Sequence, residues 1–72
     1  NNLVALRLRK GLTQRRASEV LKIPRSRIYL WEKGRELPSW AALGILMQFY
    51  QVSLPEMYPQ PEVQRLLAQS GA

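Results

Sequence analysis

Residues 13–34, TQRRASEVLKIPRSRIYLWEKG, decide how this 72-residue chain folds. Thr13 is a typical helix N-cap and predicts a helix over 14–21. Pro24 cannot lie inside a helix and disfavours helical backbone at Ile23, so residues 22–24 form a tight turn. A second helix follows over residues 25–33, with Ile28 and Trp31 facing inward, and Gly34 ends it. The stretch therefore predicts two short helices joined by a three-residue turn.

Upstream of this stretch, residues 3–10 predict a helix that begins after Asn1 or Asn2 and ends at Gly11. Downstream, Ser39 caps a helix that extends to about Tyr50. The apolar residues of that helix recur with helical spacing and predict a buried stripe of Leu43, Leu46, Met47 and Tyr50.

Ser53 caps a short helix over residues 54–58, and Pro59 and Pro61 interrupt the chain after it. Residues 62–69 form a possible sixth helix, with Val63, Leu66 and Leu67 on one side. No stretch shows the alternation of a β-strand. We therefore expect an all-α domain over residues 1–58 and a tail, linker or dimerisation segment over 59–72.

The composition excludes several classes of function. The chain has no cysteine and no histidine, so thiol nucleophiles, Ser-His triads and the usual zinc sites cannot be built. No apolar run approaches the ~18 residues of a membrane span. We expect a cytoplasmic protein that is not an enzyme and needs no metal or cofactor.

Charge is distributed unevenly along the chain. Residues 1–35 carry ten basic and two acidic side chains, a net charge of +8, whereas residues 36–72 carry one basic and three acidic ones. Such a basic half fits nucleic acid as its partner. A solvated basic surface or an anionic membrane surface remains an alternative.

Two helices joined by a short turn are typical of a helix-turn-helix, whose second helix enters the major groove of DNA. Here that helix begins with Arg25-Ser26-Arg27. A guanidinium group matches the O6 and N7 acceptors of guanine, so this segment is a candidate for base recognition. Arg15 and Arg16, near the start of the preceding helix, are candidates for phosphate contact.

Further residues fit a known pattern: Gly11-Leu12-Thr13-Gln14, Ile28, Trp31-Glu32-Lys33-Gly34, Pro38-Ser39 and Val52-Ser53-Leu54. With them, roughly residues 3–58 resemble the Cro and phage-repressor type of helix-turn-helix domain, the XRE family. The resemblance implies a five-helix bundle that binds operator DNA, usually as a homodimer. The sequence departs from the family pattern at Lys22 and Gln51, where glycine is usual. Lys22 must therefore adopt a left-handed conformation or alter the turn.

The resemblance also implies a role for individual residues. Gln14, Lys33 and Arg35 correspond to positions that contact the DNA backbone. Arg25, Ser26, Arg27 and Leu30 correspond to positions that face the groove and read bases. Arg7 and Glu32 correspond to a pair that forms a structural ion pair between helices one and three.

Two aromatic and apolar sets allow more than one interpretation. Trp31 and Trp40 could stack on single-stranded bases, but their spacing favours core packing. Four apolar residues of the second half form a candidate dimer interface: Ile45, Phe49, Leu54 and Met57. They could equally pack under residues 63–67.

The sequence thus predicts a sequence-specific regulator of transcription, a repressor, that binds double-stranded DNA. An alternative is a DNA-binding antitoxin that neutralises a protein toxin. A basic module that binds RNA or a membrane surface is a third hypothesis. Besides DNA, a toxin or a sensor domain is a possible protein partner.

Overall fold

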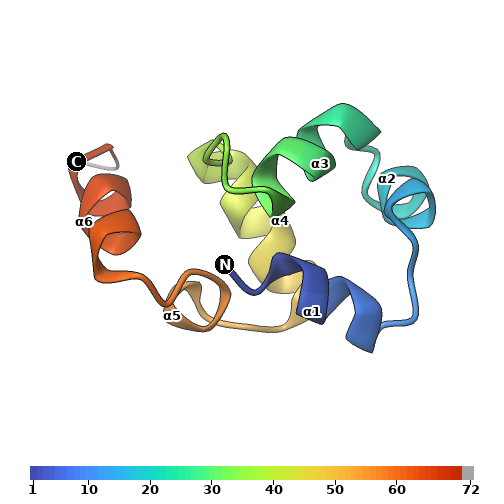
Figure 1. Cartoon of the computed structure of the whole chain (residues 1–72), viewed down its shortest axis with the longest axis horizontal. Coiled ribbons are helices and arrows are strands. Elements are labelled where there is room, and N and C mark those ends of the chain that lie inside the picture. Colours follow the sequence, from blue (N-terminus) through green and yellow to red (C-terminus); the bar gives the residue numbers. More distant parts are fainter. Residues whose placement is uncertain (71–72) are drawn as a thin grey trace.

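In the computed structural model, which describes residues 1–70, every regular element is a helix (Figure 1). The six helices are α1 (Leu3–Arg9), α2 (Gln14–Leu21), α3 (Arg25–Glu32), α4 (Trp40–Tyr50), α5 (Leu54–Met57) and α6 (Pro61–Ser70). The all-α prediction is confirmed. The predicted helix boundaries differ from the observed ones by about one residue, which is ordinary at frayed helix ends.

Side-chain caps fix where three of the helices begin. The Thr13 hydroxyl accepts a hydrogen bond from the Arg16 backbone N–H at 3.0 Å. Ser39 caps α4 in the same way through the Ala42 N–H. At α5, Ser53 and Glu56 form a reciprocal capping box. Each cap satisfies backbone donors that have no partner inside the helix.

Two residues adopt left-handed backbone where glycine would be unstrained. Lys22 has φ 57° and Gln51 has φ 56°, so Lys22 keeps the helix-turn-helix geometry without a glycine. The Ser18 hydroxyl donates to the Ile23 carbonyl at 2.6 Å and closes the same turn. The turn between α2 and α3 is therefore held by a local side-chain bond as well as by packing.

The core joins all helices except α2 through one cluster of buried side chains. Trp31 of α3 and Leu43 and Leu46 of α4 lie in it, together with Leu3, Leu6, Tyr50, Met57, Tyr58 and Leu67. Leu21 of α2 packs against this cluster. Trp31 is buried as predicted. Trp40 is 43% exposed, so the prediction that it packs in the core is wrong: it is the first residue of α4, whose buried stripe begins at Leu43.

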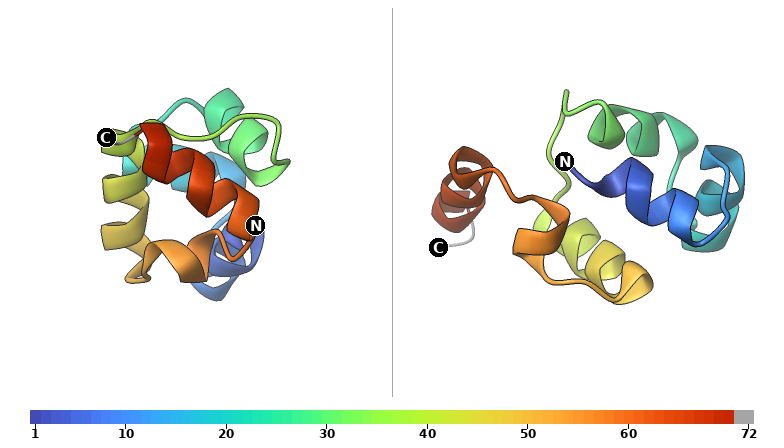
Figure 2. Two further views of the ribbon diagram at one scale, coloured as in Figure 1. Left: turned by 90° about the vertical axis from the view of Figure 1, so that its left-hand side faces the viewer. Right: turned by 60° about the horizontal axis from the view of Figure 1, so that its bottom comes forward.

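Helix α6 lies beside the N-terminal part of α4 (Figures 1 and 2). Its Leu67 is buried in the core cluster, Val63 packs against that cluster, and the Gln64 amide donates to the Tyr58 carbonyl at 2.9 Å. Leu66 is half exposed, because a helix turns 100° between Leu66 and Leu67. Val20 of α2 is likewise exposed.

Candidate nucleic-acid interface

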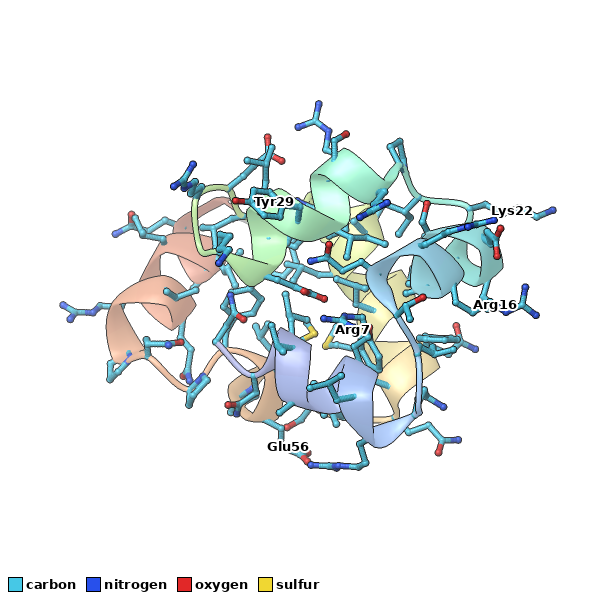
Figure 3. The ribbon with its side chains drawn as sticks, turned by 45° about the vertical axis from the view of Figure 1, so that its right-hand side comes forward. Arg7, Arg16, Lys22, Tyr29 and Glu56 are labelled. Atoms are coloured by element: carbon cyan, nitrogen blue, oxygen red, sulfur yellow. The ribbon has the colours of Figure 1, made fainter. Side chains whose placement is uncertain are left out.

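Helix α3 presents one face to the core and the opposite face to solvent. Ile28 and Trp31 are buried, so the residues about half a turn away point outward. Ser26, Tyr29 and Lys33 are exposed on this outer face, and Leu30 is partly buried beside them. Tyr29 lies on the surface of α3 in Figure 3. Three of these four residues are therefore accessible to a ligand from outside.

An open hollow of about 490 Å³ lies between the start of α2 and the outer face of α3. The residues that line it are Gln14, Arg25, Ser26, Tyr29 and Leu30. Three of the four residues predicted to read bases, Arg25, Ser26 and Leu30, therefore share one site with the predicted backbone contact Gln14.

A buried ion pair fixes the position of α3 behind this hollow. The Arg7 guanidinium, which lies in the interior in Figure 3, donates from Nε to Glu32 Oε2 at 2.7 Å and from Nη2 to Oε1 at 3.2 Å. Its Nη1 donates to the Leu12 carbonyl at 2.8 Å. The Glu32 side chain is only 4% exposed, so its charge depends on these partners.

Gln14 connects this pair to the start of α2, because its Nε2 donates to Glu32 Oε1 at 2.9 Å. The Glu32 carboxylate, on α3, therefore accepts hydrogen bonds from Arg7 of α1 and Gln14 of α2. The network sets the relative positions of the three helices. The primary amide of Gln14 keeps a second N–H and its oxygen for another partner.

Arg27 lies on the other flank of α3, away from the hollow. Its Nη1 donates to Glu36 Oε1, and the two residues line a separate surface hollow with Trp31, Leu37 and Ser39. The hydrogen bond and negative charge of Glu36 raise the pKa of Arg27 above its ordinary value. Arg27 therefore does not line the hollow that Arg25, Ser26 and Leu30 share, and its role in base reading stays a prediction. The sequence could not reveal this, because the loop over residues 33–39 decides which side of α3 Glu36 reaches.

The other basic candidates are at the surface. Arg15 and Arg16 are exposed at the start of α2 and lie 3.9 and 3.2 Å from the Glu19 carboxylate. Arg16 and Lys22 extend outward from the α2 region in Figure 3. Exposed pairs of this kind contribute little to stability, so both arginines can exchange Glu19 for another anion.

Lys33 and Arg35 are exposed in the segment that follows α3. The Lys33 ammonium lies 5.8 Å from the centroid of the Tyr29 ring. Tyr29 itself, 41% exposed and part of the hollow, was not singled out from the sequence. Its position one helical turn after Arg25 was the signal that could have identified it.

The candidate dimer residues are not equally accessible. Ile45 is 47% exposed, whereas Phe49 and Leu54 are partly buried and pack against the core. Met57 is completely buried in the same cluster as Leu67, so its assignment to a dimer interface is wrong. The alternative prediction, packing of this region under residues 63–67, describes Met57 correctly.

Among the side chains that the structure describes, no three His, Cys, Asp or Glu residues come together in a way that could hold a metal ion. In the same part of the chain, no helix is both long and apolar enough to cross a membrane.

Comparison with known proteins agrees with this geometry. The family described as "Helix-turn-helix domain" matches residues 2–58, which include all of α1 to α5. The chain belongs to this helix-turn-helix family. The resemblance to XRE-type domains is thereby confirmed.

Two curated relatives of this helix-turn-helix chain are both named HTH-type transcriptional regulator PuuR, one from Escherichia coli K12 and one from Shigella flexneri. Each is 35% identical over 60 residues, which are 83% of this chain and 32% of the relative. The chain thus spans about a third of the length of these relatives. No solved structure matches it significantly. The helix-turn-helix family and these relatives identify a DNA-binding domain of the kind found in transcriptional regulators.

Proposed function

We propose that this domain binds double-stranded DNA at specific sequences and represses transcription there. The observation that supports the proposal most directly is the hollow at the start of α3. It combines Arg25 and Ser26 with Gln14 on a surface whose position is fixed by the buried Arg7–Glu32 pair. A rigid frame with donor groups on its outer face suits recognition of base edges.

In this proposal α3 enters the major groove with Arg25 leading. The guanidinium of Arg25 donates two parallel hydrogen bonds to O6 and N7 of a guanine. Ser26 and Leu30 contact neighbouring bases from the same face. Bound in this way, the domain represses by preventing other proteins from occupying the site.

Contacts with the DNA backbone set the register and most of the affinity. We assign them to the residues on both sides of the hollow: Gln14, Arg15, Arg16, Lys33 and Arg35. Each cation that neutralises a phosphate releases a counterion, so affinity falls steeply with salt. A primary amide has two N–H donors, so Gln14 can donate one to a phosphate while the other remains on Glu32.

We further propose that the domain binds as a homodimer through the apolar surface of Ile45, Phe49 and Leu54. Ile45 is the most exposed of the three and lines a shallow surface hollow with Phe49, Val20, Leu21 and Gln48. Sedimentation of wild type and Ile45→Glu on a selected duplex tests this proposal. We expect two copies of the wild type per site and a loss of the second copy in the variant.

The experiment that tests the DNA-binding function is selection of bound duplexes from a random pool, followed by binding measurements at several salt concentrations. We expect one enriched sequence. Arg25→Ala should weaken binding to that sequence by about 1–3 kcal/mol and leave binding to random duplex almost unchanged. Arg65→Ala, in α6, removes the same charge away from the site and serves as the control. Binding of single-stranded RNA or anionic vesicles as tightly as duplex DNA would contradict the proposal.

A further inference from the structure

The hollow beside α3 has a chemical character that indicates which base it accepts. Arg25 contributes a guanidinium group to its lining, whereas Tyr29 and Leu30 contribute an aromatic ring and a branched aliphatic side chain. Tyr29 is exposed and Leu30 is partly buried, so both offer apolar surface to a ligand. The hollow can therefore take an apolar group next to a group that Arg25 binds.

The bases differ in what they present to such a surface. In the major groove, thymine carries a C5 methyl group, guanine presents two acceptors, cytosine presents an amino donor, and adenine presents an acceptor and an amino donor but no methyl group. A cytosine amino group calls for an acceptor such as a carboxylate. The hollow has no carboxylate in its lining, and its uncharged acceptors are the Gln14 amide oxygen and the hydroxyls of Ser26 and Tyr29. The acid of α3, Glu32, is buried and already bound by Arg7 and Gln14. What sets the hollow apart is therefore its apolar surface rather than a charged acceptor.

We propose that this hollow binds the C5 methyl group of a thymine close to a guanine read by Arg25. The inference rests on the proposed function and specifies its substrate: the bound site contains a guanine and a thymine as near neighbours. Tyr29 and Leu30 are the residues that distinguish thymine from the other bases.

The helical spacing limits the distance between the two bases. Arg25 and Tyr29 are four residues apart, about 6 Å along the axis of α3. Base pairs stack about 3.4 Å apart. The thymine therefore lies within about two base pairs of the guanine.

Replacing thymine by deoxyuridine tests the inference, because it removes the methyl group and keeps every hydrogen-bonding atom. The probe is the duplex enriched from the random pool, made with thymine or with deoxyuridine at each thymine position in turn. We expect one position near the guanine at which the loss of the methyl group weakens binding about fourfold. In Leu30→Ala the two duplexes should bind equally well.

Matched variants make the test specific. Leu8→Ala truncates an exposed leucine of α1, outside the hollow, and should keep the fourfold discrimination. If Leu30→Ala is too unstable to assay, Tyr29→Ala provides the same test from the exposed side of the hollow. Equal binding of the thymine and deoxyuridine duplexes by the wild type, with a selected sequence still preferred, would overturn this inference alone. Failure to select any duplex sequence would instead overturn the proposed function.

Discussion

Arg27 and Glu36 form an ion pair that ties α3 to the loop before α4. The second carboxylate oxygen of Glu36 is buried and has no hydrogen-bond partner in the described part of the chain. Glu36 therefore depends on Arg27 for its only charged contact there. This relationship makes Arg27 a structural residue in the free protein, in contrast to Arg25 on the other flank.

Removal of Arg27 should leave the Glu36 carboxylate without a charged partner. We expect Arg27→Met to lower the free energy of unfolding, and Arg27→Met with Glu36→Gln to recover part of that loss, because the double variant leaves no unpaired carboxylate. Urea unfolding of the wild type, both single variants and the double variant measures the coupling. A coupling energy near zero would show that the pair contributes nothing to stability.

The Arg7–Glu32 pair should have a larger effect because it is buried. We expect Arg7→Met to lower the free energy of unfolding by about 3–5 kcal/mol, since the Glu32 side chain is then buried without its ion-pair partner. Arg9→Met, an exposed arginine of the same helix, is the control and should change stability by less than about 0.5 kcal/mol. A loss below about 1 kcal/mol for Arg7→Met would contradict the role of the pair as the frame of the site.

Glycine should make the folded protein more stable than the natural residue does at the two positions with left-handed backbone. We expect Lys22→Gly and Gln51→Gly each to raise the free energy of unfolding by about 0.5–1 kcal/mol. Glycine removes backbone strain from the folded state, and this gain exceeds the free energy by which its extra conformational entropy stabilises the unfolded state. The converse variant Gly11→Ala, at φ 72°, should be destabilising. Thermal unfolding of the three variants provides the comparison.

The local signals in the sequence were sufficient for the fold. Thr13, Ser39 and Ser53 cap the helices they were expected to cap, and Pro24 lies at the start of α3, because caps and proline act through the backbone of adjacent residues. The family resemblance added the Arg7–Glu32 pair, which spans 25 residues and has no local signature.

Tertiary arrangement explains what the sequence did not reveal. Trp40 and Met57 have equally apolar side chains, yet one is exposed and the other buried, depending on where each helix meets the core. Arg25 and Arg27 are two residues apart and lie on opposite flanks of α3. The sequence alone does not show that only Arg27 has an acidic partner, because the loop over residues 33–39 brings Glu36 beside it. Tyr29 likewise becomes a candidate only once the hollow beside α3 is known.

Acid should destabilise the protein partly through Glu56. Its hydrogen bonds with Ser53 lower the pKa of the Glu56 carboxyl below its ordinary value of 4.5. The folded state therefore gains stability from the ionised form at neutral pH, and this gain is lost as pH falls from about 4.5 through the lowered pKa. We expect Glu56→Gln and Ser53→Ala to lose less stability between pH 7 and pH 3 than the wild type does. Melting temperatures across that range measure the difference, and identical acid slopes would rule out the capping box as its source.

High pH should destabilise the folded protein through ionisation of Tyr58. Burial raises the pKa of the Tyr58 hydroxyl from 10.0 to about 12, and the buried oxygen has no hydrogen-bond partner among the side chains and backbone that the structure describes. Because the folded pKa is the higher one, the contribution of Tyr58 to stability is intact below pH 10 and is lost as pH rises toward 12. Tyr58→Phe should therefore unfold less readily in this range. It should also match or exceed the wild type at pH 7, since it removes a buried polar group without a partner. Tyr29→Phe, at an exposed position, is the control. A marked loss of stability of Tyr58→Phe at pH 7 would mean that the hydroxyl has a partner in solution, such as a buried water.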